Sequence, residues 1–225
     1  MRVLAIDTAL EACSVAVLDT DGTTANESLP MIRGHAEALM PLIDRVMRKA
    51  GTTFAALDRI AVSTGPGSFT GLRVGISAAR GIALAAGKPA YGLTTLSAYA
   101  APHVAEDDSS TIVVAIDARH QHVYLQVFGP DARTLVAPRI ASIADAVHAA
   151  SGARVRIIGT GADMLMAAWP ADRPAPAQVE NRRAPDVVWV GRMAMAVDEP
   201  PGPPKPLYLR APDAQPQDAA RLPRR

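Results

Sequence analysis

The 225-residue sequence has a single cysteine, Cys13, and few aromatic residues. One thiol cannot form a disulfide within the chain, and it excludes a zinc site built from several cysteines. Aromatic residues make up only 4% of the chain, whereas hydrophobic residues reach 49%. The core is therefore expected to consist mainly of Ala, Val, Leu and Ile, with backbones that approach one another closely.

Neither sign of charge dominates the sequence, since 23 Lys and Arg face 22 Asp and Glu for a net charge of +1. This balance argues against tight, stand-alone binding of nucleic acid. No stretch reaches the ~18 uncharged apolar residues that would span a bilayer. The start of the chain, residues 1–18, is apolar but is interrupted by Asp7 and Glu11. It alternates like a strand and does not resemble a signal peptide. These features predict a cytoplasmic protein of one or two domains without membrane contact.

Short apolar runs alternate with helical patterns along the chain, which predicts an α/β fold. Strands are expected at 3–6, 14–18, 23–29, 58–63, 90–93, 112–116, 123–128 and 155–159. Helices are expected at about 35–50, 72–86, 94–101, 142–150 and 185–197. Proline dominates after residue 199, and residues 211–225 are expected to form a disordered tail.

An internal repeat is the most informative feature, because residues 3–18 align without a gap with residues 113–128. The five identities are Val3/Val113, Ala5/Ala115, Ile6/Ile116, Asp7/Asp117 and Val17/Val127. Chance likeness between apolar strands is the alternative. A true duplication predicts two βββαβα lobes that face each other across a cleft, as in actin-like and sugar-kinase-like ATPases. The lobes are expected at 1–102 and, reduced in size, at 111–210.

In that architecture Asp7 and Asp117 would each lie at the tip of a hairpin, where a carboxylate can hold Mg²⁺ or water beside a nucleotide. Backbone N–H groups of such turns hold phosphate, which favours glycine there. Neither turn contains glycine. Asp7, Thr8 and Asp117 are therefore predicted to be remnants of degenerate phosphate loops. A small ATPase or kinase that acts alone is the alternative.

The segment 65–75 is rich in glycine and joins a predicted strand to a predicted helix. Gly65 and Gly67 permit positive φ, and Ser68 or Thr70 can cap the helix. The helix start, with Arg73, can bind an anion, although the spacing fits neither a P-loop nor a dinucleotide fingerprint. A capped strand-to-helix turn without a ligand is the alternative.

Further along this helix, Gly71, Gly75, Ala79 and Ala83 recur at four-residue spacing and form a stripe of small residues. Such a stripe lets another element approach closely. We expect part of it to meet the protein's own sheet and part to meet a partner.

The five histidines show no spacing typical of metal ligands, and His120 and His122 are expected to be a surface pair. No metal site is predicted. Cys13 has no adjacent base and is expected to be a small buried hydrophobic residue. Ser14 and Ser68 lack the G-x-S-x-G pattern of serine hydrolases.

Six short motifs together resemble the bacterial TsaB (YeaZ) family, which works in tRNA threonylcarbamoyladenosine biosynthesis. They lie at 5–8, 12–15, 35–41, 65–75, 115–124 and 208–210. The stretch GPGSFTGLRVG at 65–75 is the most specific of them. The resemblance covers about residues 2–210 and is loose between 129 and 206.

This resemblance implies an actin-like fold that has lost its active site. It implies a scaffold or activator that pairs with a catalytic TsaD subunit, which carries the metal and modifies an adenosine beside the tRNA anticodon. An ATPase, TsaE, joins the complex, and the chain alone is expected to form a homodimer. tRNA is contacted only through the complex. No cofactor is expected to bind tightly, and ATP or ADP is expected, if anywhere, at the complex interface.

The resemblance also implies that the helices at 35–50 and 72–86 pair with matching helices of TsaD. The expected contact positions are His35, Leu39, Met47, Gly71, Gly75 and Ala79. On that basis Gly75→Leu would block pairing and leave the fold intact. A zinc peptidase, an older label for the family, is a third alternative, but no H-x-x-x-H pair is present.

Overall fold

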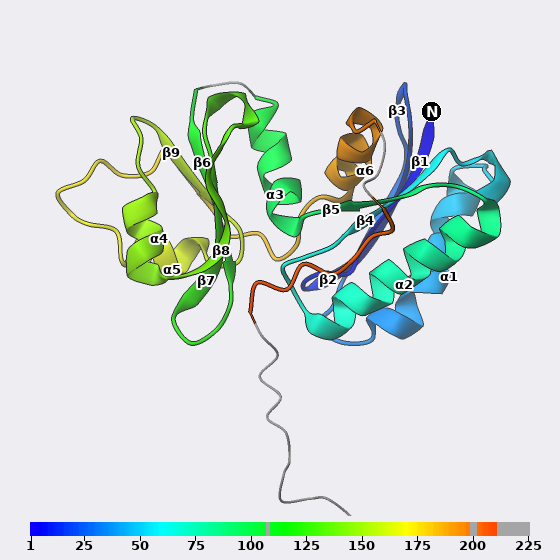
Figure 1. Cartoon of the computed structure of the whole chain (residues 1–225), viewed down its shortest axis with the longest axis horizontal. Helices are drawn as coiled ribbons and strands as arrows, with labels where there is room; N and C mark the ends of the chain where they lie inside the picture. The colour runs from blue at the N-terminus through cyan, green and yellow to red at the C-terminus, as the bar shows by residue number, and fades with distance from the viewer. Residues whose placement is uncertain (107–108, 199–201, 211–225) are drawn as a thin grey trace, which may run out of the picture.

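The computed structural model describes residues 1–106, 109–198 and 202–210 of the chain. The predicted tail at 211–225 lies outside the described residues. The chain forms two five-stranded sheets that lie side by side (Figure 1). In the described part of the chain, no helix is long and apolar enough to cross a membrane.

The first sheet has the spatial order β3-β2-β1-β4-β5. Its strands are β1 (Arg2–Asp7), β2 (Ala12–Asp19), β3 (Gly22–Pro30), β4 (Arg59–Ser63) and β5 (Ala90–Leu93). The first three strands run antiparallel, whereas β1, β4 and β5 are parallel. Parallel strands present their carboxyl ends at one edge, so Asp7 and Ser63, the last residues of β1 and β4, are brought to the same edge.

Helices α1 (His35–Lys49) and α2 (Phe69–Ala86) cover one face of this sheet (Figure 1). Their apolar residues fall on one side at helical spacing, and these side chains pack on Leu4, Ile6 and Val62 of the sheet. The Ser68 hydroxyl accepts a hydrogen bond from the Gly71 N–H and caps α2, which ends at Gly87 with φ of 64°. A short 3₁₀ turn, Phe54–Ala56, precedes β4.

The second sheet has the order β10-β9-β6-β7-β8. Its strands are β6 (Thr111–Asp117), β7 (His122–Phe128), β8 (Thr134–Ser142), β9 (Val155–Ile158) and β10 (Gln178–Glu180). Read from β8, the order and the strand directions repeat those of the first sheet, which confirms the predicted duplication. Helices α4 (Ile143–Ala149) and α5 (Ala162–Ala167) are short, so the second lobe is reduced as predicted.

The last helix of each half packs partly on the other half. Helix α3 (Thr95–Val104) places Leu96, Tyr99 and Ala100 against the second sheet. Helix α6 (Val187–Ala196) packs on Val3 and Ala5 of the first sheet, on the face opposite to α1 and α2. The two halves therefore share hydrophobic cores, while the boundaries at 102 and 111 stay a prediction.

The ungapped repeat is right for the first strand of each hairpin and wrong by one residue for the second. Leu4 lies opposite Val17, whereas Val114, its equivalent, lies opposite Gln126. The turn of the second hairpin is thus one residue shorter. The identity Val17/Val127 does not join structurally equivalent positions.

Candidate functional site

Asp7 is fully buried at the end of β1, where the first hairpin turns. Its Oδ1 accepts a hydrogen bond of 3.0 Å from the Ala9 N–H. Its Oδ2 and the Ser63 hydroxyl are both buried without a hydrogen-bond partner of normal geometry among the described residues. Burial raises the pKa of Asp7 from 3.8 to about 6, and the Ala9 N–H, nearby Ser63 and His35 offset only part of this effect.

Asp7 should make the stability of the protein depend on pH. Its pKa is higher in the folded than in the unfolded chain, so its contribution is full below about pH 4 and declines as pH rises to about 6. The loss is of the order of 3 kcal/mol. We predict that Asp7→Asn removes this loss and is more stable than the parent at pH 7.5.

Urea unfolding of both proteins between pH 4 and 7.5 measures the difference between the two stability curves. Buried His103, whose pKa burial lowers, titrates in both proteins and cancels from that difference. If the stabilities of the parent and of Asp7→Asn changed with pH in the same way, Asp7 would not be a buried carboxyl group that titrates in this range.

The turn after Asp7 is packed against helix α2. The Thr8 hydroxyl donates a 2.7 Å hydrogen bond to the Gly71 carbonyl, and the Ser68 N–H donates one of 2.7 Å to the Ala9 carbonyl. The Ala9 N–H is used by Asp7, and the Glu11 N–H points to the Arg183 carbonyl at 3.4 Å. The N–H groups of Ala9 and Glu11, two of the donors that this turn could offer to a phosphate, are therefore already engaged within the chain.

Three glycines permit this close approach of α2. A Cβ atom on Gly67 would lie 2.3 Å from the Ala9 carbonyl oxygen, and one on Gly71 would lie 2.1 Å from that of Thr8. A Cβ on Gly75 would lie 2.4 Å from the Thr8 hydroxyl. Close contact with the protein's own hairpin, rather than with a partner, therefore explains the small residues of the stripe as far as Gly75.

The six positions expected to contact a partner are all buried inside the chain. His35 is 7%, Leu39 1%, Met47 5% and Ala79 0% exposed, and Gly71 and Gly75 are also buried. The His35 Nε2 lies 3.0 Å from the Leu10 carbonyl, which ties the start of α1 to the first turn. The expectation that these residues meet a partner is corrected here, because they occupy the inner faces of α1 and α2.

Other side chains form the outer faces of these helices. Met40 of α1 is 50% exposed, and Phe69 and Leu84 of α2 are 44% and 85% exposed. Arg73, Ser77 and Arg80 are also exposed along α2. Met40, Phe69 and Leu84 are the large apolar side chains that these two helices expose, and no sequence pattern separated them from the inner stripe.

The second turn differs from the first, because Asp117 is exposed. Its carboxylate accepts a 2.7 Å hydrogen bond from the Arg119 N–H. Arg119, His120 and Gln121 adopt φ values of 63°, 52° and 60°, a left-handed conformation that is unfavourable for residues other than glycine. The structure thus gives the two aspartates different surroundings, one buried and one facing solvent.

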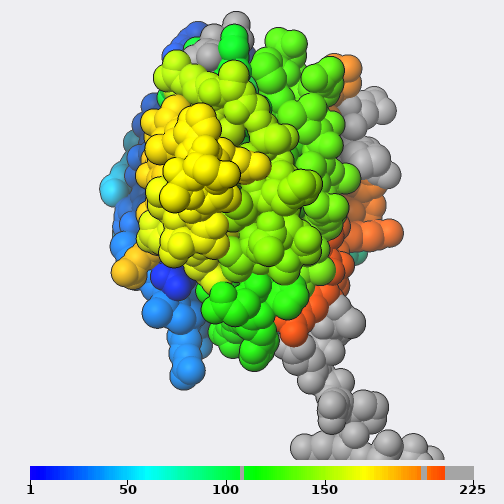
Figure 2. Space-filling model, turned by 90° about the vertical axis from the view of Figure 1, so that its left-hand side faces the viewer, coloured from blue at the N-terminus to red at the C-terminus, as the bar shows by residue number. Residues whose placement is uncertain are grey.

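A strap at residues 202–210 runs from the first lobe to the second. The Leu207 N–H donates to the Thr64 carbonyl at 2.8 Å, beside Gly65, whose φ is +106°. Leu209 packs against the cluster shared by α3 and β6, and Arg210 donates to the Ala118 carbonyl at 3.1 Å. Figure 2 shows this segment, in red, lying along the second lobe.

Tyr208 of the strap covers the start of α2. Its ring lies 5.4 Å from that of Phe69, and its hydroxyl accepts a 3.3 Å hydrogen bond from Arg73 Nε. The Arg73 guanidinium also stacks over the Phe69 ring at 3.7 Å. Arg73, expected to assist anion binding, is therefore held by aromatic side chains, while Thr70 is exposed and Ser68 caps the helix.

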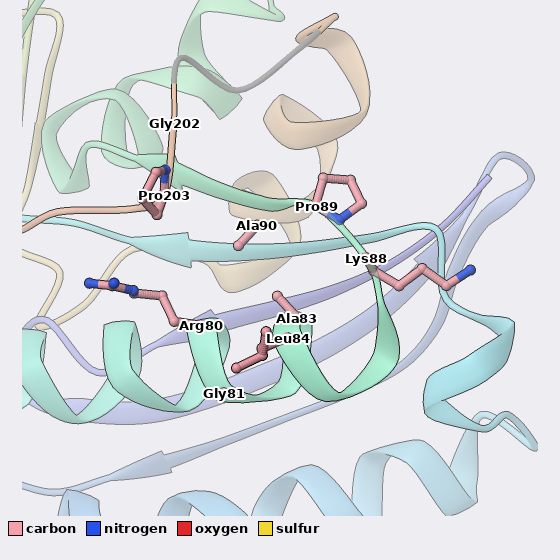
Figure 3. Close-up of a pocket in the computed structure, with 9 residues that line it drawn as sticks. All are labelled: Arg80, Gly81, Ala83, Leu84, Lys88, Pro89, Ala90, Gly202 and Pro203. Atoms are coloured by element: carbon pink, nitrogen blue, oxygen red, sulfur yellow. The ribbon is translucent and has the colours of Figure 1, made fainter.

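The two turns carry no metal cluster in the part of the chain that the structure describes. No group of three His, Cys, Asp or Glu side chains that could hold a metal occurs within residues 1–106, 109–198 and 202–210. A cavity of about 580 Å³ lies elsewhere, between the second half of α2, the start of β5 and the first residues of the strap (Figure 3).

Comparisons with known proteins agree on one family. A family model described as TsaD, tRNA N6-adenosine threonylcarbamoyltransferase, matches residues 26–165. The Escherichia coli protein TsaB, named for tRNA threonylcarbamoyladenosine biosynthesis, is 40% identical over 124 residues, which are 55% of this chain and 53% of that protein. The chain thus spans about half the length of the first curated relatives it matches.

Two further comparisons cover nearly the whole chain. An uncharacterized protein of Mycobacterium tuberculosis is 34% identical over 219 residues, or 95% of this chain and 94% of that one. A Pseudomonas aeruginosa crystal structure, described as similar to peptidase YeaZ, aligns with a TM-score of 0.78 and 27% identity. That alignment covers 93% of this chain and 99% of the other, so the two-lobed fold is shared along its length.

Proposed function

This chain belongs to the TsaB (YeaZ) family, and we propose on that basis that it is a non-catalytic subunit of the tRNA threonylcarbamoyladenosine machinery. The TsaD family model also matches this chain. The observation that carries this proposal is the close packing of the first turn against Gly67, which precedes α2, and against Gly71 and Gly75 of α2. A turn that the chain's own glycines pack against, and whose Ala9 and Glu11 N–H groups are engaged within the chain, supports a scaffold better than a stand-alone ATPase or kinase.

The proposed partner is a catalytic TsaD-type subunit, which would dock on the outer faces of α1 and α2. The two helices lie side by side on one face of the first sheet (Figure 1). Met40 and Phe69 are exposed on this layer, in keeping with the large apolar and aromatic residues that dominate protein interfaces. In the absence of this partner, we propose that the chain forms a homodimer.

The remaining components enter through the complex. A TsaE-type ATPase is proposed to join it, tRNA is proposed to contact the assembled complex rather than this chain alone, and the site of action is the cytoplasm. The chain alone is proposed to hold no cofactor tightly. ATP or ADP would bind at the boundary between subunits, where a second chain can supply the missing donors.

Thermal unfolding tests the proposal directly. Millimolar Mg·ATP should leave the melting temperature of the purified chain unchanged, whereas the TsaD-type subunit from the same organism should raise it, because a ligand of the folded state stabilises that state. ATP turnover by the chain without any partner would favour the alternative of an independent ATPase or kinase. Zinc bound tightly by the purified chain would favour the peptidase alternative.

A further inference from the structure

The cavity beside α2 is an apolar groove with a cation at each end. Ala83 and Leu84 of α2 lie on one side of it, and Ala90 of β5 lies on the other. Figure 3 shows Arg80 and Lys88 extending from opposite ends of this groove. Its volume, about 580 Å³, is within the range of sites that hold a ligand or several side chains.

The charges around the groove have one sign. Its nine lining residues include Arg80 and Lys88 but no aspartate or glutamate. Within the described ranges, neither cation has a carboxylate within ion-pair distance, in contrast to Arg45 and Lys49 of α1, which both bind Glu27. The groove therefore has positive charge that the described chain does not neutralise.

Leu84 gives the groove an apolar surface that is open to solvent. It is 85% exposed, more than any other large apolar side chain of the described chain. Gly81, one turn before it, has open space where a side chain would lie, so access from solvent is not obstructed there. An apolar side chain in the groove would cover Leu84 and exclude water from Ala83 and Ala90.

We propose that this groove binds a protein segment that presents an apolar side chain between two carboxylates. The apolar side chain would contact Leu84 and Ala90, and the carboxylates would pair with Arg80 and Lys88 at the two ends. Such pairs give selectivity for an acidic over a basic segment of the same length. Arg80 and Leu84 also belong to the outer face of α2, where the TsaD-type subunit is proposed to dock, but the test below needs no such subunit.

A phage-displayed library of random dodecapeptides, panned in parallel on the full chain and on Arg80→Glu/Lys88→Glu, tests the groove. The parent should enrich peptides in which Asp or Glu flanks Leu, Ile or Phe. The double variant should enrich Lys or Arg at those positions instead. The best parent-selected peptide should lose at least about tenfold in affinity for the double variant.

Two further variants locate the binding site. Leu84→Ser should weaken the selected peptide, whereas Arg192→Glu, at an exposed arginine of α6 on the opposite face of the sheet, should not. The proposal is overturned if no acidic–apolar motif is enriched, or if the selected peptides bind the double variant as well as the parent. Circular dichroism of each variant shows that a loss of binding is not a loss of fold.

Discussion

Gly71→Leu should leave the chain unable to fold stably. The Cβ atom of the new side chain would lie 2.1 Å from the Thr8 carbonyl oxygen. This oxygen cannot easily move away, because hydrogen bonds to Asp7 and Ala9 fix the backbone next to it. Relief would require α2 to move away from the hairpin and to break the bond from the Thr8 hydroxyl to the Gly71 carbonyl. We expect a loss of about 4 kcal/mol or more, measured by urea unfolding.

Gly81→Leu on the same helix is the matched control. Nothing lies within 4 Å of a Cβ at Gly81, so this substitution should stabilise the helix by roughly 0.8 kcal/mol. Gly75→Leu should resemble Gly71→Leu rather than leave the fold intact, which replaces the expectation drawn from the sequence. Equal stability of Gly71→Leu and Gly81→Leu would show that α2 does not press on the first turn.

Met40→Asp should strongly weaken pairing with the TsaD-type subunit without destabilising the chain. Met40 is 50% exposed on the outer face of α1, where the proposed partner docks. A carboxylate in an apolar interface centre should weaken binding by about 100-fold, or about 2.7 kcal/mol. Isothermal titration of the TsaD-type subunit into each variant measures this loss.

The second lobe offers a matched control for this surface. Met166 of α5 is 40% exposed, and Met166→Asp introduces the same charge far from α1 along the chain. Both variants should unfold within about 0.5 kcal/mol of the parent, as is usual for surface substitutions. If Met166→Asp, and not Met40→Asp, prevents pairing, the proposed docking surface lies on the wrong lobe.

The regular elements of the fold were predictable where a long pattern specified them. The alternating strands of both hairpins and the apolar stripes of α1 and α2 were found from the sequence. Strand β8 was missed because Pro138 and Arg139 interrupt its alternation. Helix α5, with six residues, and β10, with three, are too short for a period to show. Helix α2 begins at Phe69 rather than near Leu72, since Ser68 is its cap.

The sequence predicted several residues of the candidate site but not their contacts, because a residue pattern does not show what each residue packs against. Asp7 and the glycines around the start of α2 were each singled out from the sequence, but not as neighbours in space. Small residues at four-residue spacing permit close contact with either a partner or the chain itself, and only the structure places Thr8 and Ala9 against them. The sequence places residues 202–210 in the second lobe and does not predict the strap, because Tyr208 and Arg210 contact Phe69 and Ala118, which are distant in the sequence.

Reconstituted modification of tRNA would show whether this chain acts through its surface or through its first turn. The threonylcarbamoyladenosine content of tRNA would be measured with the partner subunits and with Asp7→Asn or Met40→Asp in place of the parent. Modification should stay at the parental level with Asp7→Asn and be lost almost completely with Met40→Asp. Loss of modification with Asp7→Asn, in a complex that still assembles, would show that the first turn takes part in the reaction.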